Sequence, residues 1–273
     1  MAKGEHFDLD AYLERIGYRG GRTADLATLQ AIVVGHCRHI AFENLDPFLH
    51  RTVGLDMASL QAKLVGGGRG GYCFEQNLLL IHALATLGYR TTGLAARVLW
   101  NRPSDGPPPP RSHMLVRVQL DDGPHLVDVG FGGLTLTGVL RLEPDVEQET
   151  PHEPFRLQPI GDEFVMQAKV GGRWQSLYRF GLGEAFLSDY SVTSWYLCNH
   201  PESPFATGLM AARVDEARRY ALRGHELAIH HLGGASEHRE LASPIELMRT
   251  LETDFGLNLD ALGDLEVSLR RLW

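Results

Sequence analysis

The hydrophobic residues of this chain change their spacing near Tyr89, and this change restricts the fold more than any other feature of the sequence. Before Tyr89, apolar residues recur every three or four positions, which is the spacing of amphipathic helices. After it, short segments alternate between apolar and polar residues, and turns that contain glycine separate them, which is typical of antiparallel strands. The sequence therefore predicts an α+β fold in which a helical part precedes a small antiparallel barrel or meander.

Capping residues predict several helix boundaries. Asp8, Thr23 and Asp56 each stand before a segment with helical spacing, so we expect helices to begin at these residues. Near the end of the chain, Ser243 and Glu246 have the spacing of a capping box, in which each side chain binds the other residue's backbone N–H. This pattern predicts a final helix.

A hairpin is predicted where residues 113–120 and 125–132 alternate on either side of an Asp-Gly pair at 122–123. We take that pair as a two-residue turn, because aspartate followed by glycine favours the turn types that join two strands tightly. In the tail, residues 218–232 form one further strand-like run.

Composition excludes some classes of function. The chain has 273 residues and a formal net charge of -8 at pH 7, unlike the basic surface of a nucleic-acid-binding protein. Its longest apolar stretch, at 78–87, is too short to span a bilayer, and the first ten residues have no secretory-signal core. The three cysteines are sparse and odd in number, which indicates a reducing compartment. We expect a cytoplasmic protein without nucleic-acid or membrane partners.

Cys73 is the first candidate for chemistry. It follows a glycine-rich turn and stands at the start of a strongly apolar helix that is expected to end at Gly88. A helix start presents free N–H groups and the positive end of the helix dipole, and both stabilise a thiolate. The alternative is a buried structural cysteine beneath a glycine hinge. A phosphate-binding P-loop fits less well, because no Lys-Ser or Lys-Thr pair follows the glycines.

His113 and Asp128 are candidates for the base and its orienting partner, which a cysteine nucleophile needs. With the predicted turn, Arg117 lies opposite Asp128, and His113 shares a face with Asp128 because side chains alternate along strands. The two would still be four residues apart along the ladder, or about 13 Å. A two-residue shift in register or a bulge near Pro124 would bring them together. A hydrogen-bonded structural histidine remains the alternative.

Other segments carry weaker signals. The Gly-Phe-Gly-Gly segment at 130–133 could expose N–H groups to phosphate oxygens, but by itself it fits a bulge or a simple turn better. His36, Cys37 and His39 resemble part of a metal site, but no second ligand pair with suitable spacing follows, so we expect no metal. Cys198, next to aromatic residues, is expected to belong to the core.

The motif set as a whole resembles the arylamine N-acetyltransferases along almost the full length of the chain. The segment RGGYCFEQN at 69–77 is the most specific match and is similar to the family's nucleophile motif. His113 and Asp128 follow in the order that the family shows. Further similar segments are FENLDPF at 42–48, VDVGFGG at 127–133 and NHPESPF at 199–205.

The resemblance implies a three-part architecture with a Cys-His-Asp core like that of cysteine proteases. An N-terminal helical bundle that carries the nucleophile is expected at 1–90, and an antiparallel β-barrel that carries the histidine and the aspartate at 91–190. A C-terminal α/β lid is expected at 191–273. The proline-rich stretch at 103–110 is not a signature of the family.

The resemblance also implies acetyl-CoA as the co-substrate and arylamines, with hydrazines as further candidates, as acceptors. The expected reaction is ping-pong, passes through an acetylated Cys73, needs no metal and serves xenobiotic metabolism, in a monomer or a homodimer. The residues implied to contact CoA are Gly130, Phe131, Gly132 and Gly133. Those implied to line the acceptor pocket are Phe42, Phe131 and Phe205, and Glu43 with Arg69 is implied to form a supporting ion pair.

Two rival functions share these residues. A cysteine protease or transglutaminase could use the same trio on peptide substrates, without any dependence on acetyl-CoA. A protein that only binds CoA or an aromatic ligand would carry an inert Cys73, and replacing that residue with alanine would leave binding intact.

Overall fold

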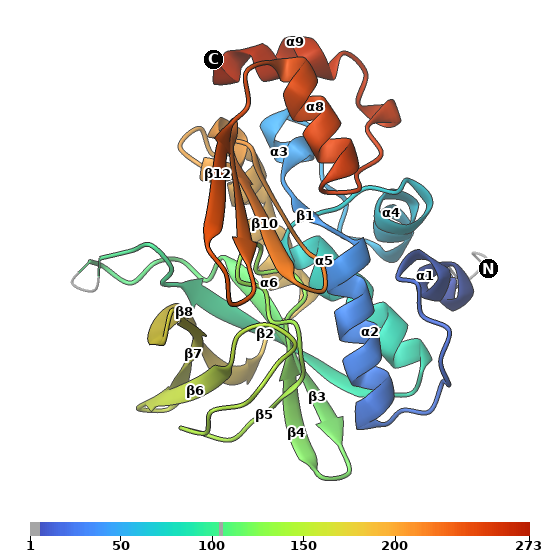
Figure 1. Cartoon of the computed structure of the whole chain (residues 1–273). Helices are drawn as coiled ribbons and strands as arrows, with labels where there is room; N and C mark the ends of the chain where they lie inside the picture. Colours follow the sequence, from blue (N-terminus) through green and yellow to red (C-terminus); the bar gives the residue numbers. More distant parts are fainter. Residues whose placement is uncertain (1–5, 104–105) are drawn as a thin grey trace.

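The computed structural model describes residues 6–103 and 106–273, so part of the proline-rich stretch at 103–110 lies outside it. Figure 1 shows helices on one side, a curved seven-stranded sheet below and a five-stranded sheet above. Helix α5 (Cys73–Thr86) ends just before strand β2 (Arg90–Val98). The predicted change from helices to strands near Tyr89 is therefore confirmed.

The N-terminal part consists of short helices around α5. Asp8 caps α1 and Asp56 caps α4, as predicted, through side chains that accept backbone N–H groups. The prediction of Thr23 as a helix start was wrong: Asp25 caps α2, because its carboxylate accepts the N–H of Thr28 at 2.8 Å. The elements before α5 are α1 (Leu9–Arg15), α2 (Leu26–His39), β1 (Phe42–Glu43), α3 (Leu45–Phe48), α4 (Met57–Leu60) and a π-helical turn (Gln61–Gly66).

The seven-stranded antiparallel sheet has the order β5-β4-β3-β2-β8-β7-β6 and curls into a nearly closed barrel. Single bridges from the segment after β5 to β6, at Pro144–Leu157 and Gln148–Phe155, bring its two edges together. Its interior is packed with apolar side chains such as Leu115. The strands after β2 are β3 (His113–Leu120), β4 (Gly123–Val127), β5 (Leu140–Arg141), β6 (Phe155–Ile160), β7 (Glu163–Val170) and β8 (Arg173–Glu184).

The hairpin between β3 and β4 differs from the prediction by two residues. Leu120 pairs with Gly123, so the turn consists of Asp121 and Asp122 and does not include the glycine. A shift of two residues leaves every side chain on the same face, so the alternation of the sequence could not distinguish the two registers. Continuing the observed ladder places Asp128 two residues from His113 instead of four.

The C-terminal part is a five-stranded sheet covered by helices. The sheet has the order β1-β9-β10-β11-β12, so the two residues of β1 join it from the N-terminal part. The run at 218–232, predicted as one strand, is a hairpin of two strands that turns at Gly224, where φ is +62°. The strands are β9 (Met210–Val214), β10 (Arg218–Arg223), β11 (Glu226–His231) and β12 (Ser236–Glu240).

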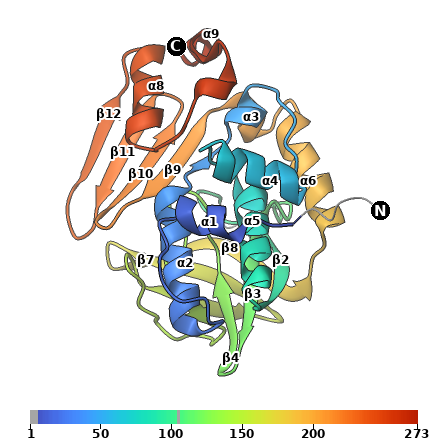
Figure 2. The same cartoon turned by 90° about the vertical axis from the view of Figure 1, so that its right-hand side faces the viewer.

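Helices complete the C-terminal part (Figure 2). They are α6 (Leu187–Asn199), α7 (Pro204–Thr207), α8 (Pro244–Thr253) and α9 (Leu265–Leu269), with short 3₁₀ turns at Asp260–Leu262 and Arg270–Leu272. Ser243 caps α8 as predicted, but Glu246 accepts the N–H of Ala242 and not that of Ser243. The predicted capping box is therefore only half formed. The division of the chain at 90 and 190 stays a prediction.

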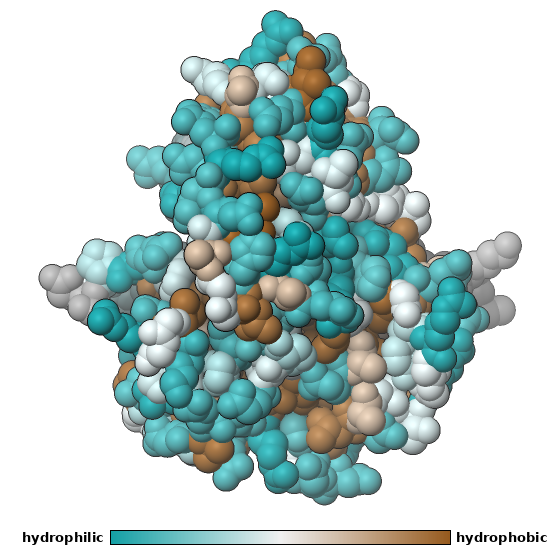
Figure 3. Space-filling view, viewed as in Figure 1, coloured by the Kyte–Doolittle hydropathy of each residue, from teal (hydrophilic) through white to brown (hydrophobic). Residues whose placement is uncertain are grey.

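The surface drawn in Figure 3 is mostly hydrophilic, and its apolar residues lie in small separate groups. Within the described residues, none of the helices combines the length and apolar character needed to cross a membrane.

Replacing Ser243 with alanine should destabilise the protein by about 1 kcal/mol, because the first turn of α8 loses its side-chain acceptor. Ser243→Asn keeps a side-chain acceptor at the same place, so its loss of stability should be only a few tenths of the loss in Ser243→Ala. Urea unfolding followed by circular dichroism measures both. Equal loss in the two variants would show that the cap contributes nothing.

Candidate active site

Cys73 is the first residue of α5, and glycines before it allow the chain to pass very close to its neighbours. A side chain at Gly70 would place its Cβ 2.1 Å from the carbonyl oxygen of Ala41, and one at Gly71 would lie 2.6 Å from a Glu75 carboxylate oxygen. Close approach, and not a left-handed backbone, therefore requires glycine at these two positions. The Glu75 carboxylate accepts the N–H of Tyr72 at 3.1 Å and completes the start of the helix.

A buried group of five charged side chains supports this loop: Glu43, Asp46, Lys63, Arg69 and Glu75. Arg69 donates to one Glu43 oxygen from Nε at 3.0 Å and from Nη2 at 2.7 Å, so these two residues form the expected ion pair. Lys63 lies 2.6 Å from both Asp46 and Glu75. Burial raises the pKa of Glu75 to about 7, although the Lys63 charge opposes this.

His113 and Asp128 are in direct contact. The Nε2 atom of His113 donates to Oδ2 of Asp128 at 2.6 Å, and both side chains are almost fully buried. Because β4 ends at Val127, Asp128 is free of the ladder and can turn toward the first residue of β3. The Sγ atom of Cys73 lies 3.6 Å from the carbonyl oxygen of Ser112, the residue before His113. The structure thus brings together the three residues that the sequence singled out.

The His113–Asp128 pair favours charged forms of both groups. Burial alone would lower the pKa of His113, but the Asp128 carboxylate outweighs it and, with Cys73 beside the ring, raises the pKa to about 10. Burial alone would likewise raise the pKa of Asp128, but the His113 charge and hydrogen bonds from His113, Gly130 and Asn77 hold it below its usual value. At neutral pH, His113 is therefore an imidazolium next to the Cys73 sulfur.

Asn77 is a site residue that the sequence reasoning missed. Its Nδ2 donates to Asp128 Oδ1 at 3.1 Å and to the carbonyl oxygen of Met114 at 2.8 Å, and its Oδ1 accepts the N–H of Val129. It thereby ties α5, the helix that begins at Cys73, to both β3 and Asp128. The available signal was its place four residues after Cys73, on the same face of α5.

The segment at 130–133 lies directly against Cys73. A Cβ at Gly130 would be 2.7 Å from the Cα of Cys73, and the N–H of Gly130 donates to Asp128 Oδ1 at 3.0 Å. Gly132 has a φ of +91° and lies over the ring of Phe42. Close approach requires glycine at 130, and a left-handed backbone favours it at 132, whereas neither reason applies at Gly133.

The three phenylalanines proposed for a pocket do not form one cluster. Phe42 and Phe205 are neighbours, with ring centroids 6.1 Å apart. Phe131 instead packs its ring at 78° to that of His113, at 5.2 Å, and against Tyr178 at 5.1 Å. Of the three rings, that of Phe131 is the one in contact with the His113 ring among the described residues, whereas Phe42 and Phe205 contact each other.

Tyr178 is a second residue that the sequence reasoning missed. Its ring lies 4.7 Å from that of His113, and its hydroxyl is buried near the Asp128 carboxylate. Burial and the Asp128 charge raise its pKa well above the usual value, so it stays a neutral phenol. Nothing in the strand-like pattern of β8 marked this tyrosine as different from its neighbours.

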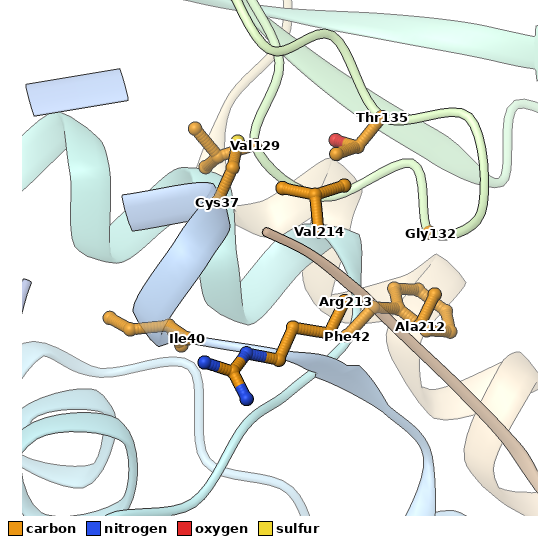
Figure 4. A pocket seen from close by; sticks show the side chains of 9 residues that line it. All are labelled: Cys37, Ile40, Phe42, Val129, Gly132, Thr135, Ala212, Arg213 and Val214. Carbon is orange, nitrogen blue, oxygen red and sulfur yellow. The ribbon is translucent and has the colours of Figure 1, made fainter. Parts of the chain in front are cut away.

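Figure 4 shows a small cavity lined in part by the 130–135 segment. Cys37, Phe42, Gly132 and Thr135 contribute to its lining, together with residues of β9, whereas Cys73 and His113 do not. Burial raises the pKa of Cys37 to about 12, so this second thiol stays protonated.

His36, considered for a metal site, is engaged in protein hydrogen bonds at both ring nitrogens. Nδ1 accepts from the Tyr12 hydroxyl at 2.9 Å, and Nε2 donates to Gln76 Oε1 at 2.7 Å. Burial lowers its pKa to about 4. Within the part of the chain that the structure describes, the His, Cys, Asp and Glu residues include no cluster of three that could hold a metal ion.

Known proteins are similar to this chain in sequence and in overall fold. Residues 25–263 match a family model described as N-acetyltransferase. The arylamine N-acetyltransferase of Mycolicibacterium smegmatis is 45% identical over 266 residues, which cover 96% of each chain. The chain belongs to the arylamine N-acetyltransferase family. It is therefore an arylamine N-acetyltransferase enzyme, as the motif set predicted.

Solved structures of this family confirm the predicted fold class. The arylamine N-acetyltransferase of Mycobacterium tuberculosis superposes with a TM-score of 0.94 at 45% identity, over 96% of this chain and 99% of that chain. The arylamine N-acetyltransferase of Mycobacterium marinum, solved in complex with CoA, gives a TM-score of 0.94 at 43% identity, over 97% and 99%.

Replacing Asp128 with asparagine should lower activity by about 10³-fold or more, because His113 loses its charged partner while it stays buried. The pKa of His113 should then fall well below its wild-type value of about 10. NMR titration of the histidine rings measures this change, and Asp162→Asn in an exposed turn serves as the control. An unchanged His113 titration would contradict the assignment.

The same pair should make stability depend on alkaline pH. Because the His113 pKa is raised above its ordinary value of 6.5, its contribution is complete below about pH 6.5 and is lost as pH rises through about 10. The difference in unfolding free energy between wild type and Asp128→Asn should shrink over that range. Urea unfolding at a series of pH values provides the measurement.

Replacing Lys63 with methionine should cost about 3 kcal/mol of stability, because Asp46 and Glu75 stay buried without their shared cation. Lys63→Arg keeps a positive charge and should lose less stability than Lys63→Met. The urea midpoint of each variant measures the effect. Equal midpoints for wild type and Lys63→Met would show that this cation does not support the loop.

Proposed function

We propose that Cys73, His113 and Asp128 are the catalytic triad of this enzyme, and that they transfer an acetyl group from acetyl-CoA to an arylamine through an acetyl-cysteine. The observation that carries the proposal is the buried 2.6 Å hydrogen bond between His113 and Asp128, next to a cysteine at a helix start. This arrangement stabilises an imidazolium beside a thiolate, which is the reactive form of a cysteine nucleophile.

The first half-reaction consumes the donor. The Cys73 thiolate attacks the thioester carbonyl carbon, and backbone N–H groups at the start of α5 are suited to stabilise the oxyanion. The bond from that carbon to the CoA sulfur then breaks. The departing sulfur takes the proton from Nδ1 of His113, since Nε2 is held by Asp128. An acetyl thioester on Cys73 and a neutral His113 remain.

The second half-reaction consumes the acceptor. The amine nitrogen attacks the acetyl carbon, neutral His113 accepts the proton that the nitrogen loses, and the bond to the Cys73 sulfur breaks. This regenerates the thiolate and the imidazolium. Because arylamines are largely uncharged near neutral pH and stack on aromatic rings, the rings of Phe42, Phe131 and Phe205 suit this acceptor.

The glycine-rich turn at 130–133 is the proposed contact for the CoA side of the donor. Its position against the Cα of Cys73 supports this role. The related M. marinum enzyme, solved in complex with CoA, supports CoA as the donor's carrier. The acceptance of hydrazines, a cytoplasmic location, a monomeric or homodimeric state and the absence of metal or nucleic-acid partners stay predictions.

Incubation with acetyl-CoA in the absence of amine should produce a stable acetylated protein with the acetyl group on Cys73. Intact-mass spectrometry and peptide mapping detect it, and later addition of an arylamine should remove it. Cys73→Ser should show no such thioester, whereas Cys37→Ser, which changes a buried protonated thiol, should behave as wild type. Folded wild-type protein that stays unmodified would overturn the proposal.

A further inference from the structure

Arg219 reaches from β10 of the C-terminal sheet to the segment that follows Asp128. Its side chain is 3% exposed. Nη1 donates to the carbonyl oxygens of Gly133 at 3.3 Å and Thr135 at 3.1 Å. Nε and Nη2 donate to the carboxylate of Glu153, at 2.6 Å for the shortest of these contacts. One planar guanidinium therefore connects three segments of the chain.

The turn that Arg219 holds has little stiffness of its own. Three of its four residues, at 130–133, are glycines, which have the most conformational freedom to lose on folding. Thr135 closes the turn: its hydroxyl donates to the carbonyl oxygen of Asp128 at 3.0 Å and accepts the N–H of Phe131 at 3.4 Å. Figure 4 shows Thr135 and Gly132 on the same loop, facing residues of β9.

The 130–133 turn contacts both Cys73 and His113. Gly130 lies against the backbone of Cys73, and the ring of Phe131 packs edge-on to the ring of His113. A movement of the turn would therefore alter both the space above the sulfur and the packing of the imidazole. Misplacement of about 1 Å at such a site can cost about 10²-fold in rate.

We propose that Arg219 is a positioning residue for acetyl transfer: through Thr135 it holds the 130–133 turn against Cys73 and His113. The proposal rests on the proposed role of Cys73 as the acetyl carrier. Burial would raise the pKa of Glu153, but the Arg219 charge holds it below its usual value, so the carboxylate stays ionised and fixes one edge of the guanidinium. The other edge is then directed at the turn.

Arg219→Lys separates this role from simple charge pairing. Lysine keeps a positive charge for Glu153, but its single ammonium cannot also present the planar fork that reaches Gly133 and Thr135. The matched control is Arg218→Lys, the next residue of β10, whose partner is Asp215. The two substitutions are chemically identical and adjacent, but Arg218 does not contact the turn.

The test is single-turnover acetylation of the full-length protein by acetyl-CoA, followed by rapid quench and intact-mass spectrometry. Its amplitude reports the folded fraction, whereas its rate constant reports the geometry of the site in the molecules that are folded. We expect Arg219→Lys to lower the rate constant by roughly tenfold to a hundredfold. Arg218→Lys should keep the wild-type rate constant.

Thr135→Val provides a second variant, because it keeps the size of the side chain but removes its bonds to Asp128 and Phe131. It should slow acetylation to a similar extent, and the double variant Arg219→Lys/Thr135→Val should lose no more than the larger single effect. If Arg219→Lys does not fold, the acetylation rate constant of Thr135→Val alone tests the proposal.

A wild-type rate constant in Arg219→Lys, even with a reduced amplitude, would overturn the positioning role and leave Arg219 as a structural residue. The same result for Thr135→Val would overturn the proposed path. Wild-type protein that is not acetylated at all would instead refute the acetyl-cysteine mechanism, so the two failures are distinguishable.

Discussion

The position of the loop that carries Cys73 depends on the buried ion pair between Glu43 and Arg69. Glu43 belongs to β1 of the five-stranded sheet, and Arg69 belongs to the loop that leads to Cys73. Burying two charges is costly, and the cost is offset here because each has further partners: Leu45 donates to Glu43, and Asp46 lies near Arg69. The nucleophile's loop is thereby fixed to the C-terminal sheet.

His113 and Asp128 are fixed separately, by the barrel. Their approach comes from the register of β3 with β4 and from the end of β4 at Val127. Asn77 joins the two halves, because its amide group binds Asp128 and the backbone of β3 from the helix that carries Cys73. The reactive geometry is thus produced where two independently supported parts meet, and no single element contains it.

Much of this could be predicted from the sequence. Local patterns and motifs were enough to predict the change from helices to strands near Tyr89 and the candidate triad. They also predicted the helix caps at Asp8, Asp56 and Ser243. The hairpin register could not be predicted, because a two-residue shift preserves the pattern of buried and exposed faces. The roles of Tyr178 and Arg219 could not be predicted either, since each depends on a contact between residues distant in the sequence and on no local signal. For Asn77, its spacing from Cys73 was a signal, but its bond to Asp128 was not predictable.

The pairing of β1 with β9 has a consequence for how the protein is made. Phe42 pairs with Ala212, and Asn44 binds the backbone of Phe205, Gly208 and Met210. During synthesis, the N-terminal residues leave the ribosome long before these partners exist. The edge of β1 that pairs with β9 therefore stays unpaired until most of the chain has been translated. A nascent chain that stops in the barrel after Asp128 carries all three proposed catalytic residues but lacks the sheet that holds Glu43 in place.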